Sequence, residues 1–422
     1  MTTSPPKILY CTSHWLDGRS YGGQLRSLHL ARLLQSRADV RVALFPLAPV
    51  EAGAATRTGN EFDVRGIFEF ERRPIRGWRE RIGHEFDPYF AGTHHATLPE
   101  SAARRFEELA AEHDLIWFHG IRIPNSIGLR VWKKTILDID DVPSLFYHSA
   151  LRSTRSPWNA MMALRHKVLW RRREKVLRQR FTAICVCSDR DKAYLGGGER
   201  VHVIPNGFEP PANAPEMHPA TPPRIGFIGK LEYAPNEDGV RWFIEKVWPR
   251  IQSIHPDARL RLVGVGSERI AIAPNANIDR LGWVADPAEE VASWSCMIVP
   301  LRMGAGTRIK IAEAFSRRCP VVSTRLGAFG YDVEDGEEVL LADTPKAFAA
   351  SCLRVISDRA LATRMVNAAW ARFNAEWSWP AIGPKVTAVL HYGLHHSAST
   401  VARSVSQNSG LPHELVDRSP AI

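Results

Sequence analysis

The stretch from Pro300 to Pro320 combines glycines with cations where a predicted strand passes into a predicted helix. Gly304 and Gly306 let the backbone approach a ligand closely, and Arg308 and Lys310 follow them. A helix start already presents unpaired N–H groups and the positive end of the helix dipole, so added cations favour a phosphate or diphosphate there. The stretch therefore predicts an anion-binding loop. A helix cap with solvated Arg and Lys side chains is the simpler alternative.

Glu313 is the one acid in this basic neighbourhood. A bound diphosphate would repel its carboxylate, so its natural partners are neutral hydroxyls, such as those of a ribose or another sugar. The loop and the helix together therefore indicate a ligand that carries both an anionic group and hydroxyl groups.

A histidine, His119, follows a second apolar segment, residues 115–118. An open α/β sheet keeps its chemistry at the carboxyl ends of its strands, which is where this histidine is expected to lie. It is suited to donate a hydrogen bond to a sugar hydroxyl or to act on a proton. A histidine satisfied by the local backbone is the alternative.

Three acids, Asp138, Asp140 and Asp141, end the next predicted strand. A D-x-D spacing is suited to a divalent ion that bridges to a diphosphate. The basic loop is already able to neutralise a diphosphate, so we favour loop capping or acceptor binding for these acids. The adjacent His94 and His95 are poor metal ligands because neighbouring positions point apart. We therefore expect neither a metal nor a cofactor.

Length and charge limit what kind of protein the chain can be. With 422 residues, the chain is too long for one ordinary core and suggests two domains of roughly 200 residues each. The formal net charge is +10 and the pI is about 9.5. Nucleotides, nucleic acid and acidic membranes are all partners that this charge would favour, so charge alone does not choose among them.

The six cysteines lie mostly in apolar segments and show no metal-binding spacing. They are typical of buried free thiols in a reducing compartment. The amino terminus lacks the pattern of a signal peptide, and no run of about 18 apolar residues occurs. The expected location is therefore the cytoplasm.

The amino-terminal segment has the order of a βαβ unit. Residues 7–11 form an apolar strand, Gly22 and Gly23 open an apolar-faced helix, and residues 40–45 supply the next strand. The ligand site of such a unit lies at the carboxyl ends of its strands. Because a tight turn explains two adjacent glycines equally well, this pair is a weak signal by itself.

A basic segment, residues 157–181, reads as one helix with eight Arg or Lys residues against the single acid Glu174. A helix of this kind can lie on an anionic membrane surface, and residues 158–181 are the candidate contact. An ordinary surface helix with a solvated basic face is the alternative. No nucleic-acid recognition motif accompanies the charge, so no nucleic-acid partner is expected.

Proline-rich residues 209–223 mark a linker between two domains. The predicted organisation is an amino-terminal domain (1–208), the linker, a second domain (224–380), a helix predicted to cross back to the first domain (381–394) and a disordered tail (395–422). The second domain repeats the strand and helix alternation but lacks a true G-x-G-x-x-G sequence, which counts against an NAD enzyme.

With these segments in view, the chain resembles the retaining GT-B glycosyltransferases of family 4. The likeness rests on YGGQLRSLHLARLL, HVIPNGFE, RIGFIGKLEYAPNEDGVRWF, RLVGVGS, LGWV and, above all, PLRMGAGTRIKIAEAFSRRCPVVSTRLGAFG. It implies an α/β fold of two Rossmann-like domains that face each other across a cleft. It also implies metal-independent, hexosyltransferase-like transfer of a sugar from a nucleotide-diphosphate donor with retention of configuration. The acceptor would be a glycan or a lipid-linked sugar, as in polysaccharide biosynthesis.

The resemblance also implies roles for particular residues. Glu313 would hold the ribose, Arg308 would meet the diphosphate, Lys230 would bind a phosphate and His119 would touch the transferred sugar. The residues around the donor would be Gly22, Gly23, Gly229, Gly304, Ala305, Gly306, Thr307 and Lys310.

Two positions depart from the family pattern. Ala305 replaces the first of two glutamates that are usually eight positions apart, and Asn236 replaces a second phosphate-binding lysine. Arg308 and Lys310 can compensate in charge, but contacts to the donor sugar become uncertain. A nucleotide-sugar epimerase of the same fold and a non-catalytic nucleotide-sugar or glycan-binding protein therefore stay open as alternatives.

Overall fold

The structure, a computed structural model, describes residues 4–17, 23–47, 53–72, 77–89, 96–128, 134–154, 156–209, 216–272, 277–304 and 306–396. Several predicted features lie outside these residues: Gly22, Ala305, the pair His94 and His95, the middle of the linker and the tail beyond residue 396.

The amino-terminal domain is built on a seven-stranded parallel sheet with the order β3-β2-β1-β6-β7-β8-β9. Helices can cover both faces of such a sheet, so its strands are expected to be apolar throughout. The strand β1 agrees, since every residue after Lys7 is buried. The strands are β1 (Lys7–Thr12), β2 (Asp39–Leu44), β3 (Asp63–Ile67), β6 (Leu115–His119), β7 (Thr135–Asp138), β8 (Ala183–Val186) and β9 (Val201–Val203).

Two apolar clusters lie on the two faces of this sheet. Ile8 and Tyr10 face one cluster together with Leu28 of the first helix, while Leu9 and Cys11 face the other. The helices are α1 (Gly23–Gln35), α2 (Ala54–Glu61), α3 (Trp78–Phe86), α4 (Glu100–Ala111), α5 (Arg122–Ser126), α6 (Pro143–Ser153), α7 (Pro157–Lys175), α8 (Leu177–Arg180) and α9 (Asp189–Tyr194). A small antiparallel pair, β4 (Glu71–Arg72) and β5 (Ala96–Thr97), stands apart from the sheet.

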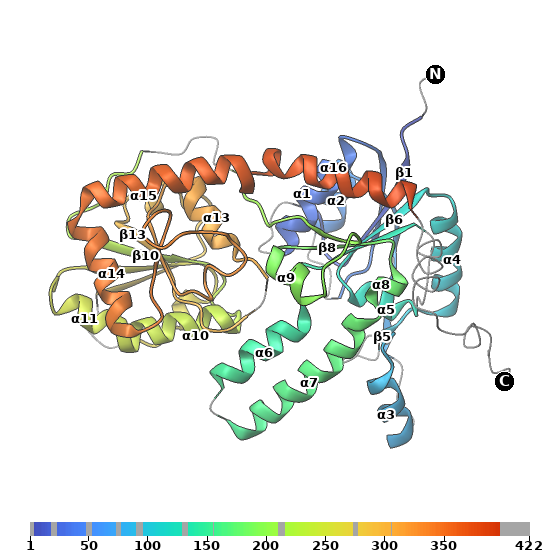
Figure 1. Cartoon of the computed structure of the whole chain (residues 1–422), viewed down its shortest axis with the longest axis horizontal. Helices are drawn as coiled ribbons and strands as arrows, with labels where there is room; N and C mark the ends of the chain where they lie inside the picture. Colours follow the sequence, from blue (N-terminus) through green and yellow to red (C-terminus); the bar gives the residue numbers. More distant parts are fainter. Residues whose placement is uncertain are drawn as a thin grey trace.

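The helices α6 and α7 pack side by side as a hairpin that projects from the amino-terminal domain, with α3 nearby (Figure 1). The segment predicted as one helix over residues 157–181 is divided, because α7 ends at Lys175 and α8 begins at Leu177. Among the described residues, no helix is both long enough and apolar enough to cross a membrane.

The carboxyl-terminal domain repeats the architecture with a six-stranded parallel sheet of order β12-β11-β10-β13-β14-β15. Its strands are β10 (Arg224–Ile228), β11 (Arg259–Val263), β12 (Ile278–Gly282), β13 (Cys296–Val299), β14 (Val321–Ser323) and β15 (Leu340–Leu341). Its helices are α10 (Ala234–Trp242), α11 (Trp248–Gln252), α12 (Ala288–Ala292), α13 (Ile309–Ser316), α14 (Pro345–Ser357) and α15 (Arg359–Arg372).

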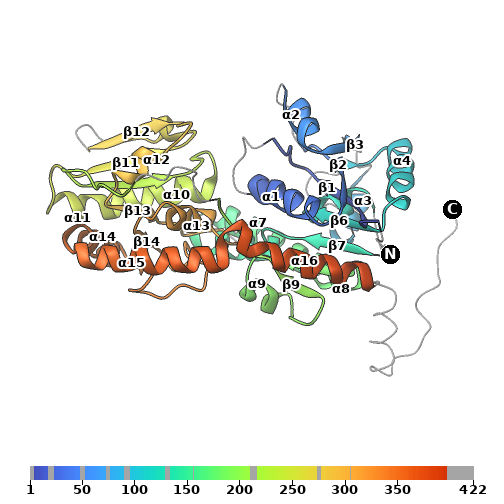
Figure 2. The same cartoon turned by 90° about the horizontal axis from the view of Figure 1, so that it is seen from above.

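The final helix, α16 (Trp379–His395), leaves this domain and packs on the first one. Figures 1 and 2 show it running beside α1 and along the amino-terminal sheet. Trp379, Ile382 and Val386 belong to the same apolar cluster as Ile8 and Tyr10 of β1. The ring of Trp379 also stacks on His29 of α1, with the ring centroids 4.7 Å apart. The amino-terminal core is therefore completed by residues from the end of the chain.

Candidate active site

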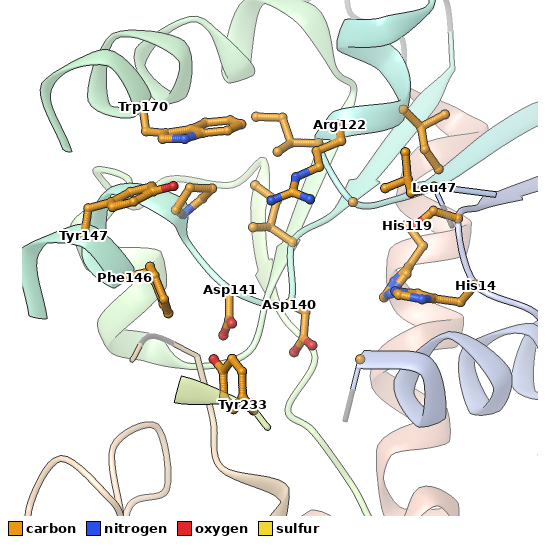
Figure 3. A pocket seen from close by; sticks show the side chains of 17 residues that line it. His14, Leu47, His119, Arg122, Asp140, Asp141, Phe146, Tyr147, Trp170 and Tyr233 are labelled. Atoms are coloured by element: carbon orange, nitrogen blue, oxygen red, sulfur yellow. The ribbon is translucent and has the colours of Figure 1, made fainter. Parts of the chain in front are cut away.

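The two sheets place their loops around one cavity of about 400 Å³ between the domains (Figure 3). Most of the residues that line it come directly after the carboxyl ends of β1, β6 and β7, where a parallel sheet leaves room for a ligand. The side chains labelled in Figure 3 are His14, Leu47, His119, Arg122, Asp140, Asp141, Phe146, Tyr147, Trp170 and, from the other domain, Tyr233.

His119 is the last residue of β6 and is almost completely buried. Its Nδ1 lies 2.7 Å from Oδ2 of Asp138, the last residue of β7. If the ring is neutral and Nδ1 donates to that carboxylate, Nε2 remains the ring atom that can accept a hydrogen bond from a ligand. The pairing therefore holds the orientation of a histidine that lines the cavity.

Asp138 itself does not reach the cavity. It is fully buried and also bound by Arg26 of α1, with Nη2 2.5 Å from Oδ1 and Nε 3.0 Å from Oδ2. Burial alone would raise the pKa of Asp138, but the charges and hydrogen bonds of Arg26 and His119 outweigh burial and lower it to about 2. The sequence predicted loop capping or acceptor binding for this acid, but it lies behind His119 and does not line the cavity.

Asp140 and Asp141 do line the cavity. Asp140 accepts a hydrogen bond of 2.6 Å from Nδ2 of Asn206, whose Oδ1 in turn accepts one from Arg26. Burial in the cleft raises the pKa of Asp141, and the negative charge of Asp140 raises it further, while Arg308 acts in the opposite direction. The D-x-D segment therefore contributes one carboxylate tied into a network and one that faces the other domain.

The basic loop lies between β13 and α13, as the sequence predicts. Gly304 and Gly306 both have positive φ values, 125° and 68°, which favour glycine. The Arg308 side chain folds back over Gly304 and is buried. Thr307 Oγ1 is buried and has no hydrogen-bond partner in the described part of the chain. The loop thus presents a buried cation and an unsatisfied hydroxyl close together.

Lys310 reaches the loop after β10. Its ammonium lies against Gly229, where a side chain would overlap it, and above the ring of Phe227 at 5.1 Å. Burial lowers the pKa of Lys310 to about 8, with Arg308 adding to the effect and Glu313 opposing it. A bound anion would offset these two causes, so the pocket of Lys310 is suited to a negatively charged ligand.

The other residues considered for donor binding make contacts within the carboxyl-terminal domain. Glu313 lies within α13 and pairs with Arg317 at 3.4 Å. Lys230 is exposed and pairs with Glu232 at 3.3 Å. Asn236 donates to the Lys230 carbonyl at 2.7 Å, so it holds the loop after β10 in place.

The two domains touch at this site. Gly304 N donates to Ser149 Oγ of α6 at 2.7 Å. At Gly306, a Cβ would overlap Asp141 Oδ1 and would lie 2.7 Å from the Asp140 carbonyl oxygen. The predicted anion loop therefore meets the D-x-D segment directly across the cleft.

Several cavity residues were not found from the sequence. His14 follows β1 as His119 ends β6, and its ring centroid lies 5.5 Å from that of His119. Burial, assisted by His119 and Arg122, lowers the pKa of His14 to about 3. The strand-end rule that selected His119 would also have selected His14. Arg122 lies three residues after His119, close to the same strand end. The aromatic residues of α6 and α7 lack such a signal, because their approach depends on how the hairpin packs.

Of the glycines predicted to approach the phosphates from the first domain, Gly23 lines the cavity at the start of α1. A Cβ on Gly23 would lie 2.9 Å from Asp140 Oδ2. In the described part of the chain, no group of three or more His, Cys, Asp and Glu side chains is arranged to hold a metal ion.

Two Rossmann-like domains that face each other across a cleft, with loops from both at the strand ends, define the GT-B fold. Solved structures agree with it. The chain is 17% identical to Anabaena Alr3699/HepE, described as a complex with UDP and glucose, at a TM-score of 0.60 that covers 92% of this chain and 99% of that one. For WaaG, described as a glycosyltransferase involved in lipopolysaccharide biosynthesis, the identity is 11% and the TM-score 0.58, with 90% and 99% covered.

The sequence comparison is more specific but shorter. Residues 222–358, which lie in the carboxyl-terminal domain apart from the last residues of the linker, match the family model for glycosyl transferases group 1. A curated relative from Klebsiella pneumoniae, described as an uncharacterized 44.6 kDa protein in the cps region, is 26% identical over 156 residues. That match spans 33% of this chain and 40% of the relative.

Proposed function

We propose that this chain is a glycosyltransferase that moves a sugar from a nucleotide-diphosphate donor to a glycan or lipid-linked acceptor, with retention of configuration. The observation that carries the proposal is the meeting of the basic loop with the His119 side of the cavity. Gly304 and Gly306 contact Ser149 and Asp141, so a donor held by the loop would lie next to the amino-terminal residues. The group 1 match over residues 222–358 and the UDP and glucose bound by HepE support this direction.

In this proposal the carboxyl-terminal domain binds the nucleotide diphosphate. Arg308, Lys310 and Lys230 face its phosphates, and Glu313 exchanges its ion pair with Arg317 for the ribose hydroxyls. The leaving diphosphate gains negative charge in the transition state. Fixed cations in a partly dry site stabilise that charge more than they stabilise the ground state, which lowers the barrier.

The amino-terminal domain holds the transferred sugar. With Nδ1 donating to Asp138, His119 Nε2 accepts a hydrogen bond from a sugar hydroxyl. His14 stays neutral over the working pH range, because its pKa is lowered to about 3, and therefore adds no second positive charge. The reaction is proposed to be metal-independent, since Arg308 and Lys310 supply the positive charge that a divalent ion would otherwise provide.

A second candidate, a nucleotide-sugar epimerase, is favoured by one observation. The raised pKa of Asp141 gives the cavity a carboxyl group able to exchange a proton near neutral pH, as an epimerase base would need. The two reactions differ in their products, because only transfer or donor hydrolysis releases a nucleoside diphosphate.

The experiment is a thermal-shift screen of nucleoside diphosphates and their sugars, followed by product analysis for each compound that stabilises the protein. We expect one nucleotide series to bind and its sugar to be turned over with release of the nucleoside diphosphate, also in the presence of a chelator. Epimer formation would favour the second candidate. Binding without any product would indicate a non-catalytic binding protein.

We further propose that the α3 and α7 helices contact an anionic membrane surface at the cytoplasmic face. Both helices expose stripes of large apolar residues: Trp78, Ile82 and Phe86 on α3, and Trp158, Met161, Leu164 and Val168 on α7. Trp78 is 68% exposed and Trp158 is 65% exposed. Large apolar residues beside Arg and Lys are typical of helices that lie in a membrane interface.

The eight basic residues of this segment differ in exposure. Arg173 and Arg180 are buried, so these two cannot contribute to a solvated basic face of the predicted helix. Arg173 donates to the Glu85 carbonyl, and Arg180 donates to Asn125. Arg165, Arg172 and Lys175 remain exposed. Arg165 pairs with Glu85, so Arg172 and Lys175 are the exposed cations that would attract anionic lipid, while the apolar stripes would enter the interface.

The membrane proposal is tested by cosedimentation with phosphatidylglycerol and phosphatidylcholine vesicles. Replacing both Trp78 and Trp158 by Gln is expected to weaken binding to the anionic vesicles at least about tenfold, because large apolar side chains leave the interface. Trp283→Gln is the matched control, since Trp283 is 62% exposed on the other domain. Unchanged binding of the double variant to the vesicles would contradict the proposal. A wild-type dimer that is lost in the double variant would also contradict it, because the apolar stripes would then contact a second copy of the chain.

A further inference from the structure

Arg122 lines the same cavity but has no part in the proposed binding of the donor. It begins α5, three residues after His119 along the chain. Its guanidinium projects into the middle of the cavity, with Tyr147 and Trp170 on one side and His119 on the other (Figure 3). A cation is thus placed next to the histidine proposed to hold the transferred sugar.

Within the part of the chain that the structure describes, the guanidinium of Arg122 makes no ion pair and no hydrogen bond. Two other arginines of the same domain differ. Arg26 is held by Asp138 and Arg57 by Asp17, at 2.8 Å in the second case. Arg122 is exposed at the cavity and forms no ion pair with the described residues, so its guanidinium is available to an anion brought by a ligand.

The donor diphosphate is not the expected anion. Asp140 and Asp141 lie between Arg122 and the carboxyl-terminal domain (Figure 3), and Asp141 also meets the loop at Gly306. A diphosphate on Arg308 and Lys310 is therefore separated from Arg122 by two carboxyl groups. An anion at Arg122 belongs to a second ligand, on the side of the cavity formed by the amino-terminal domain.

The walls around Arg122 indicate what else this second ligand contains. Phe146 and Tyr147 come from α6 and Trp170 comes from α7, and all three line the cavity. Aromatic rings offer apolar faces and edges against which the C–H groups of a sugar ring can pack. Arg122 provides a planar fork of donors that matches a carboxylate or phosphate with two parallel hydrogen bonds.

We propose that Arg122 binds an anionic group of the acceptor, either a carboxylate or a phosphate, beside a sugar ring that packs on Phe146 and Tyr147. The inference rests on the proposed glycosyltransferase function and specifies its acceptor as an acidic or phosphorylated glycan. Arg122 is then a specificity-determining residue, because a neutral acceptor would leave its guanidinium without a partner.

The test compares three sugars that differ in charge: p-nitrophenyl glucoside, p-nitrophenyl glucuronide and a phosphorylated p-nitrophenyl glucoside. Binding is measured by ligand-detected NMR without donor, so the result does not depend on turnover. We expect at least one anionic sugar to bind about 10-fold or more tightly than the neutral one, since hydrogen bonds to charged groups contribute that much. The carboxylate and phosphate arms identify which anion the site prefers.

Arg122→Gln should remove this preference, so that the anionic sugars bind no more tightly than the neutral one, whereas Arg122→Lys should retain part of it. Arg325→Gln is the matched control, because Arg325 is an exposed cation of the other domain. Equal binding of the three sugars, no binding of any, or a preference that survives in Arg122→Gln would each overturn the proposal. A failure of the proposed function would be seen in a different experiment: no nucleoside diphosphate would bind in the thermal-shift screen.

Discussion

His119 Nδ1 and Asp138 Oδ2 lie 2.7 Å apart at the carboxyl ends of neighbouring strands, and both side chains are buried. Arg26 contacts the same carboxylate and balances its charge. A histidine that lines the cavity is therefore held by an acid that does not line it.

We expect Asp138→Asn to lower donor turnover by about 100-fold, because small displacements of a substrate-contacting group have effects of that size. Affinity for the nucleoside diphosphate should stay within about twofold, since its proposed contacts lie in the other domain. Turnover is measured by release of the nucleoside diphosphate, and affinity by calorimetry.

A double-variant comparison tests whether Asp138 acts through His119. His119→Ala alone should lose about as much activity as Asp138→Asn, and the combined variant should lose little more, as in a coupled pair. Thermal unfolding is measured alongside, because Asp138→Asn leaves Arg26 buried without its counter-charge and should destabilise the fold by about 3 kcal/mol or more. Independent, multiplying losses of activity would show that the two residues have separate roles.

Arg308→Ala is expected to weaken nucleoside-diphosphate binding by about 10- to 100-fold, the value of a hydrogen bond to a charged group. The Arg325→Ala variant removes an exposed cation of the same domain and should bind as the wild type does. Calorimetric titration of both variants gives the comparison. Equal affinities would remove Arg308 from the donor site.

Glu313→Gln is predicted to affect recognition of the ribose only. The wild type should lose about 10-fold in affinity when the nucleotide lacks its ribose hydroxyls, because a carboxylate forms strong hydrogen bonds with them. The variant should bind both nucleotides with similar, weaker affinity. A variant that still distinguishes them would show that another group contacts the ribose.

Gly306→Ala should impair the meeting of the two domains. The added methyl would overlap Asp141 Oδ1, and the φ of 68° is unfavourable for alanine. We expect about a 10-fold or greater loss of turnover, because the reacting groups would no longer be aligned. Gly336→Ala is the control, since Gly336 also has a positive φ of 92° but nothing lies within 4 Å of its added Cβ. Equal losses in the two variants would point to backbone strain alone.

Acidification should weaken the contact between α1 and α16 through His29. Burial, together with Arg32, lowers the pKa of His29 to about 4, against the opposing charge of Glu61. The unfolded chain takes up this proton near its ordinary pKa of about 6.5, whereas the folded chain resists. His29 therefore contributes stability that is present above about pH 6.5 and is lost as the pH falls towards 4.

The measurement is the thermal midpoint of the wild type and of His29→Asn across this range of pH. The wild type should lose more stability on acidification than the variant does, because His14, His113, His166 and His202 contribute equally to both curves. Parallel curves would show that His29 does not take part in the pH dependence.

The fold was predictable because its signals are local. Residues 7–11 and 115–118 are apolar runs that form the adjacent strands β1 and β6, and the glycine loop before Arg308 joins β13 to α13 as predicted. The strand ends then lie at one edge of each sheet, which brought His119 to the cleft by topology alone.

The site was less predictable because its decisive contacts are distant in sequence. Asp138 is directed away from the cavity by Arg26, which lies 112 positions earlier. Arg180 is buried by its bond to Asn125, 55 positions away. The sequence shows that these side chains are charged, but it does not show which of them form an ion pair or hydrogen bond inside the fold. The presence of such a bond decides whether the side chain is buried or exposed.

The two passages of the chain between the domains lie side by side, where Phe208 bridges to Ser378 and donates to the Trp377 carbonyl at 3.0 Å. Two connections bound together behave as one hinge, so opening of the cleft is a rotation about a single axis near these residues. In Figure 1, α16 and α6 lie on opposite sides of the molecule. The bond between Ser149 and Gly304 is therefore far from that axis, and a rotation that opened the cleft would break it early.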